Sequence, residues 1–172
     1  ADSFKVVEHY IQGFKEGTHL SLMGNHEAEF LRFLEGCHYS YFNDQKKFPK
    51  CLFSVSEDFK SGRRGAALFD SLADFNELFK ITWLCQGGVE TLQSYNCPID
   101  KQAYWKLDSE HLDYLCAMPL FWENDKVIAT HAMVQKKEFS NLVKNIKNQP
   151  SQVTEDPIEL RLFRQAAFDA LW

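Results

Sequence analysis

Apolar residues recur at helical spacing in several separate stretches of the chain. The first stretch predicts a helix that Ser3 caps and Gly17 ends, with an apolar face made of Val6, Val7, Tyr10, Ile11 and Phe14. The same spacing predicts further helices that end at Gly36, run from Leu72 to Leu84, from Asp108 to Ala117, and from Pro157 to Trp172.

Short runs rich in β-forming residues lie between these helices. Strands are predicted from Thr18 to Met23, from Leu120 to Glu123 and from Val127 to Thr130, with a polar turn between the last two. Helices that alternate with strands in this way predict an α/β fold.

Two regions lack a clear period. From residue 37 to residue 71 the pattern fades into aromatics, lysines and the basic turn Ser61-Gly62-Arg63-Arg64-Gly65, and we interpret this region as an insertion or cap. The lysine-rich stretch 136–147 and the polar segment 148–156 are typical of a solvated helix followed by a loop.

The tetrapeptide Gly24-Asn25-His26-Glu27 carries the first candidate chemistry. It follows the predicted strand directly, and a glycine there can turn the chain sharply and place the next side chains at a sheet edge. Asn25 offers a hard amide oxygen for a divalent metal, and His26 can give or take a proton near neutral pH. Glu27 is expected to begin the next helix and orient its neighbours. The alternative is that Asn25 and His26 only cap that helix.

A second candidate, His131, ends the β-rich run Val127-Ile128-Ala129-Thr130. Two strands that each deliver a ligand at one end, far apart in the sequence, are what a metal site in an α/β fold needs. The competing interpretation is a histidine packed in the core.

Together these residues resemble the calcineurin-like metallophosphoesterases, in the bacterial branch similar to serine/threonine protein phosphatases. Gly24-Asn25-His26-Glu27 and His131-Ala132 match two of its motifs, and the match extends through Trp83-Leu84, Gly87-Gly88 and Thr91-Leu92-Gln93-Ser94-Tyr95. The resemblance implies one metallophosphoesterase domain that includes residues 1–172, an α/β fold with a β-sandwich flanked by helices.

The family's other motifs, an early Asp-x-His, Gly-Asp-x-x-Asp-Arg-Gly and a late Gly-His-Thr, do not occur in this sequence. We therefore expect an internal piece of a longer enzyme, with a fold incomplete at both ends and no activity on its own. Met23 stands where eukaryotic-type phosphatases carry a phosphate-binding Arg, and Met133 stands where Gly is usual. Arg63 and Arg64 could replace the missing phosphate contact, or be merely solvated.

For function, the resemblance implies metal-dependent hydrolysis of phosphomonoesters. Two divalent ions would be the cofactors, manganese first and iron, zinc, nickel or magnesium as alternatives. Asn25 and His131 would ligate one ion, and His26 would protonate the leaving alkoxide. Phosphoserine or phosphothreonine proteins or a small phosphoester would be the substrate. The alternatives are a dinucleoside polyphosphate hydrolase and a non-catalytic binding or regulatory domain.

Composition and charge limit the partners and the cellular compartment that the sequence predicts. The 172 residues are 45% hydrophobic and include 15 Phe, enough to build a sizeable core. A net charge of −5 argues against a nucleic-acid partner, and no apolar run is long enough for a membrane span. Five cysteines without a C-x-x-C pair argue against a disulfide framework or structural zinc, and favour the cytoplasm.

Overall fold

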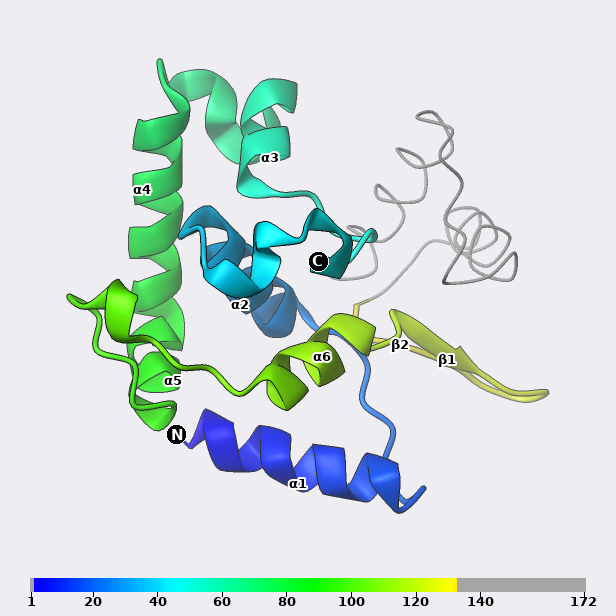
Figure 1. Cartoon of the computed structure of the whole chain (residues 1–172). Coiled ribbons are helices and arrows are strands. Elements are labelled where there is room, and N and C mark those ends of the chain that lie inside the picture. Colours follow the sequence, from blue (N-terminus) through cyan, green and yellow to red (C-terminus); the bar gives the residue numbers. More distant parts are fainter. Residues whose placement is uncertain (1, 133–172) are drawn as a thin grey trace.

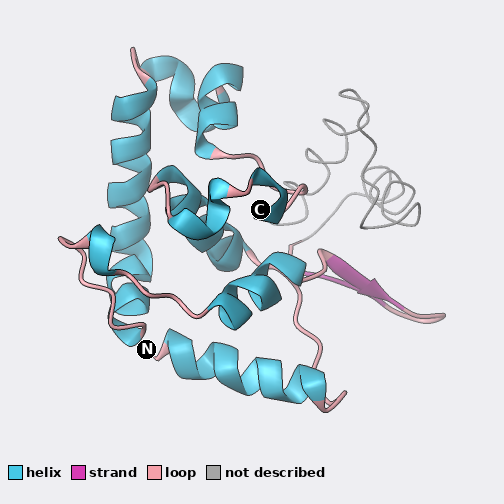
Figure 2. Cartoon of the chain, in the orientation of Figure 1, coloured by secondary structure: helices cyan, strands magenta, loops and turns pink. Residues whose placement is uncertain are grey.

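The computed structural model describes residues 2–132 of the chain. Helices account for most of these residues, and the sheet found among them has two strands (Figures 1 and 2). The helices are α1 (Ser3–Lys15), α2 (Asn25–Gly36), α3 (Val55–Ser61), α4 (Leu72–Trp83), α5 (Val89–Ser94) and α6 (Ser109–Ala117). The connections include short 3-10 turns at Ser40–Asn43, Gln45–Lys47, Arg63–Leu68 and Gln102–Tyr104, and a π-helical segment at Leu84–Gly88.

The helices predicted within these residues are confirmed, with small shifts at their ends. The cap of α1 is Asp2, whose carboxylate accepts from the Lys5 amide at 3.3 Å, and the predicted cap Ser3 is the first helical residue. Asp108, at which the predicted helix begins, caps α6. Side chains that accept from exposed amides at a helix start fix that start, and the sequence shows them directly. The predicted helix from Pro157 to Trp172 and the stretches from 136 to 156 lie outside the described residues.

The two late strands are also confirmed, as a hairpin. Strands β1 (Phe121–Glu123) and β2 (Ile128–Thr130) pair antiparallel, with Trp122 opposite Ala129. The hairpin extends from the helical body, away from α4 (Figure 1).

The strand predicted from Thr18 to Met23 is wrong. Residues 19–24 form neither helix nor strand, and join α1 to α2 as a loop. A strand needs a neighbour for its alternate amides and carbonyls. Here the Met23 amide donates to the Pro119 carbonyl at 2.9 Å, an isolated bond outside any ladder. Residues 2–132 are thus α-rich with a little β structure, and no β-sandwich is present in them.

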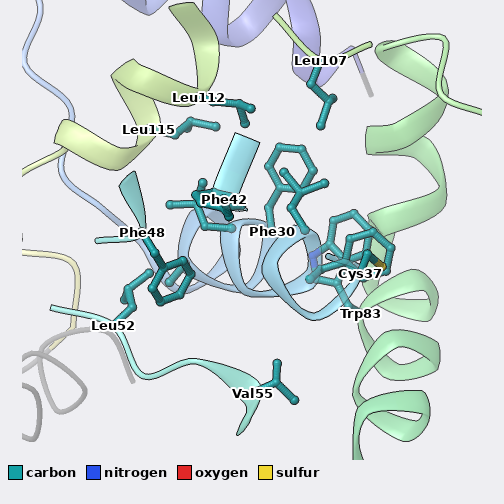
Figure 3. Packing of buried hydrophobic residues seen from close by; sticks show 14 of the residues in the cluster. Phe30, Cys37, Phe42, Phe48, Leu52, Val55, Trp83, Leu107, Leu112 and Leu115 are labelled. Atoms are coloured by element: carbon teal, nitrogen blue, oxygen red, sulfur yellow. The ribbon is translucent and has the colours of Figure 1, made fainter. Parts of the chain in front are cut away.

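The core surrounds α2. Every residue from Ala28 to Leu34 is buried, and Leu31 and Leu34 have no exposed surface. Figure 3 shows Leu112 and Leu115 of α6 on one side of this helix, Phe48, Leu52 and Val55 on the opposite side, and Trp83 of α4 at one end. Burial of that many large side chains, each contributing roughly 1.5–3 kcal/mol, makes α2 the element on which the others pack.

Buried charges attach the region 37–71 to α2. Arg32 of α2 forms an ion pair with Asp58 of α3, and their side chains are 4% and 0% exposed. Arg64 lies beside them, with its guanidinium 2.5 Å from the Glu29 carboxylate. Arg63 packs its guanidinium 3.6 Å from the ring centre of Phe53. Both arginines that the sequence offered as phosphate contacts thus contact other side chains of the protein.

Two further observations concern the chemical character of the described part. All five cysteines are free thiols. Between residues 2 and 132, no helix combines the length and the apolar character that crossing a membrane requires.

The buried ion pair gives a first testable prediction. Asp58→Ala leaves Arg32 charged and buried without its carboxylate, which should lower the free energy of unfolding by about 3–5 kcal/mol. Glu77→Gln is the control, because it removes the exposed Lys80–Glu77 pair and should cost less than about 1 kcal/mol. Urea titration followed by circular dichroism measures both. Similar midpoints for the two variants would show that the buried pair does not hold α3 to α2.

Candidate functional site

The structure brings Asn25 and His131 together. Asn25 is the first residue of α2 and His131 follows β2, 106 positions later, yet the His131 Nε2 lies 3.2 Å from the Asn25 Oδ1. Two acceptor atoms would repel each other at this distance, so the imidazole in this arrangement carries its proton on Nε2 and donates to the amide oxygen. The two predicted metal ligands therefore share one hydrogen bond.

Position 24 favours glycine because a Cβ has too little room there, and not because of the backbone conformation. Its φ of −104° and ψ of 175° are extended values that any residue adopts, so the sharp turn expected at this glycine does not occur. A Cβ at this position would lie 2.7 Å from the Glu27 Oε2 and 2.9 Å from the His131 Cε1. The absence of a side chain lets the imidazole of His131 lie directly against the backbone.

Glu27 fixes the start of α2. Its Oε2 accepts from the Gly24 amide at 3.1 Å, which satisfies one of the exposed amides at the helix N-terminus. The orienting role predicted for Glu27 is therefore visible in its geometry. Asn25 does not act as the helix cap, since Gly24 occupies that position and the Asn25 oxygen faces His131.

His26 faces a cavity. The cavity has a volume of about 130 Å³ and lies between α1, the first turn of α2, and the segment that joins α4 to α5. His26 is exposed, so its ring is accessible to a molecule that enters. The cavity is lined by Ser3, Val7, His26, Glu27, Phe30, Trp83, Gln86, Gly87, Gly88, Thr91, Tyr95 and Leu115.

The polar wall of this cavity is internally bonded. The Thr91 hydroxyl donates to the Gly87 carbonyl at 3.0 Å, and the Ser3 hydroxyl lies 3.3 Å from the Thr91 hydroxyl. The Tyr95 hydroxyl lies 2.9 Å from His111 Nδ1, and burial raises the pKa of Tyr95, so the phenol stays protonated. Gly87-Gly88 and Thr91 were cited from the sequence only for the resemblance, without a role in a site. The paired glycines are the sequence feature that could have pointed to this wall of the cavity.

Met23 does not contribute to the site. Its side chain is fully buried in the core, and Phe30 and Leu31 of α2 belong to the same cluster. Met23 therefore packs in the core together with residues of α2. Met133, the other departure noted in the sequence, lies outside the described residues.

The Asn25–His131 pair fits two neighbouring positions on one divalent ion. Ligands at about 2.1 Å from a metal and at right angles to each other are about 3 Å apart, close to the observed separation. Binding through Nε2 would require the neutral tautomer with its proton on Nδ1, and not the tautomer that donates to Asn25. In the part of the chain that the structure describes, no group of three or more His, Cys, Asp or Glu side chains has the arrangement of a metal site.

Comparison with known proteins adds no relative: no family model, no curated protein and no solved structure matches the chain.

Gly24→Ala tests whether His131 packs on the Gly24 backbone. The added methyl group must displace Glu27 and His131, so the Asn25–His131 hydrogen bond should break while the extended backbone remains unstrained. Gly17→Ala is the matched control, since Gly17 has a φ of +71° and open space around it. It should cost up to about 1 kcal/mol in stability without moving His131. Imidazole NMR signals of His131 report the difference. A His131 signal that shifts equally in both variants would contradict this packing.

Proposed function

We propose that the protein is a metal-dependent phosphoesterase that hydrolyses phosphomonoesters at a site formed by Asn25, His26 and His131. The supporting observation is the Asn25–His131 contact: two ligands of the types that divalent metals accept, 106 positions apart, meet beside a histidine that faces a cavity. The proposed fold is the metallophosphoesterase-type β-sandwich flanked by helices, of which residues 2–132 form a helical part.

In this proposal each residue has a definite task. Two divalent ions, manganese first, would supply a hydroxide nucleophile and neutralise the phosphate charge. Asn25 Oδ1 and His131 Nε2 would hold one of them. His26 would hold a proton and donate it to the departing alkoxide oxygen, and its exposure beside the cavity gives the oxygen access to it.

The local electrostatics support phosphate binding at this place. The N-terminus of α2 carries the partial positive charge of the helix dipole, and α2 spans 12 residues. Glu27 satisfies the Gly24 amide and holds the first turn in position. A phosphate near Asn25 and His26 would therefore meet an ordered helix end.

The proposed substrates are phosphoserine or phosphothreonine proteins and small phosphoesters, with dinucleoside polyphosphates as the alternative. A cytoplasmic location is proposed from the five cysteines without C-x-x-C spacing. A non-catalytic domain derived from the fold is the second candidate, supported by the finding that no group of three or more His, Cys, Asp or Glu side chains among residues 2–132 has the arrangement of a metal site.

Metal dependence is the direct test of the proposed reaction. The protein expressed from its complete open reading frame should hydrolyse p-nitrophenyl phosphate with manganese and lose this activity on chelation. His131→Ala should lower kcat/KM by more than the roughly 10–100-fold that loss of an outer-shell partner costs. His9→Ala removes an exposed histidine of α1 and should leave the rate unchanged. Turnover that survives both chelation and His131→Ala would refute the proposal.

The role of His26 can be separated from metal binding. His26→Asn should lower kcat by about two to four orders of magnitude for alkyl phosphates, because their leaving oxygens need a proton. Aryl phosphates should lose less, and the metal content measured by mass spectrometry should not change. Equal losses for alkyl and aryl esters would assign His26 a role other than that of a general acid.

A further inference from the structure

We infer that the cavity beside His26 binds the leaving alcohol of the substrate and selects a small alcohol that carries a hydroxyl or ammonium group. Alcohols that carry a carboxylate or a second phosphate are disfavoured. This inference rests on the proposed phosphoesterase function and names the substrate class that the site accepts.

The hydroxyls of the wall act as acceptors. Thr91 gives its one hydroxyl hydrogen to the Gly87 carbonyl, so in the contact between Thr91 and Ser3 the donor must be Ser3. Both hydrogens are then used inside the wall. What Ser3 and Thr91 can offer to a molecule in the cavity is lone pairs, which bind N–H and O–H groups.

The charge of the cavity also favours a ligand that carries N–H or O–H groups. The Glu27 carboxylate lines it, and only Oε2 accepts from the Gly24 amide, which leaves Oε1 acceptor capacity for a ligand. Among the described residues that line the cavity, none is a lysine or an arginine. The lining also contains His26, whose proton goes to the departing oxygen in the proposed reaction, so Glu27 is the charge left for the substituent of the alcohol. A ligand ammonium would be stabilised beside this carboxylate, and a ligand carboxylate would be repelled.

The shape of the cavity limits the size of the alcohol. Its volume is about 130 Å³, and Phe30, Trp83 and Leu115 supply apolar surface. Gly88 packs directly against the Trp83 indole, where a Cβ would overlap the ring, and Gly87 has a φ of +99°. This kinked segment, with π-helical bonding of the kind that recurs at functional sites, holds the wall close to His26.

These features also discriminate between the proposed substrates. A dinucleoside polyphosphate would extend a further phosphate from the scissile one, and phosphate binding relies on cationic side chains or open amides. The described lining contains no lysine or arginine, and it includes Glu27 and the hydroxyls of Ser3 and Thr91. Small amino-alcohol or polyol phosphates fit it better.

The test compares phosphomonoesters that differ in one substituent. The protein from the complete reading frame, loaded with manganese, is assayed with phosphoethanolamine, 2-hydroxyethyl phosphate, phosphoglycolate and p-nitrophenyl phosphate. The ammonium and hydroxyl esters should exceed phosphoglycolate in kcat/KM by about tenfold or more, the equivalent of one screened charge contact. If p-nitrophenyl phosphate is hydrolysed but the three alkyl esters react equally, the inference fails and the proposed function stands.

A change of charge in the cavity lining makes this test more specific. Gln86→Lys introduces a cation into the cavity lining and should raise kcat/KM for phosphoglycolate while lowering it for phosphoethanolamine. Gln93→Lys adds the same charge on the exposed surface of α5, outside the cavity, and should leave the ratio of the two esters unchanged. The same change of ratio in both variants would mean that net charge, and not the cavity, sets the preference.

A binding measurement keeps the inference testable even if no ester is hydrolysed. Titration of ethanolamine into the isotopically labelled protein should shift the backbone NMR signals of Gly87, Gly88 and Thr91, and titration of glycolate should not. Shifts with ethanolamine in a protein without turnover would refute the esterase and retain the pocket. Equal shifts with both compounds, or none with either, would overturn the inference.

Discussion

The burial of α2 on all sides is the constraint on which the rest of the structure depends. A helix buried from Ala28 to Leu34 cannot leave a charge unpaired, yet this stretch contains Glu29 and Arg32. Each is neutralised by a residue from the region 37–71, Arg64 for Glu29 and Asp58 for Arg32. The sequence of the central helix thus requires the region 37–71 to fold back onto it. Residues that looked like a loose basic turn complete the interior.

The same burial makes the start of α2 the accessible part of this helix. Asn25 and Glu27 are partly exposed and His26 is exposed, whereas the next residues are enclosed. The candidate site therefore lies where a rigid helix emerges from the core. Functional groups held in this way keep their relative positions better than groups on a free loop.

Much of the helical architecture could be predicted from the sequence, because helical spacing and capping residues are local signals. The end of α2 and the extents of α4 and α6 followed from them. The strand expected from Thr18 to Met23 could not be judged locally, since a strand exists only with a partner. For the site, two motifs identified Asn25 and His131. The cavity beside His26 was missed, because its lining comes from segments whose convergence only the folded chain shows.

The candidate site depends on the position of the β1–β2 hairpin, because His131 directly follows β2. Strands β1 and β2 extend outward, and the side chains of Trp122, Val127 and Ile128 on this hairpin are exposed. Behind the hairpin, the bond from the Met23 amide to the Pro119 carbonyl joins its base to the residue before Gly24. Because His131 directly follows β2 and Asn25 begins α2, a shift of the hairpin relative to α2 would change the distance between His131 and Asn25. The separation of Asn25 and His131 therefore depends on the position of the hairpin.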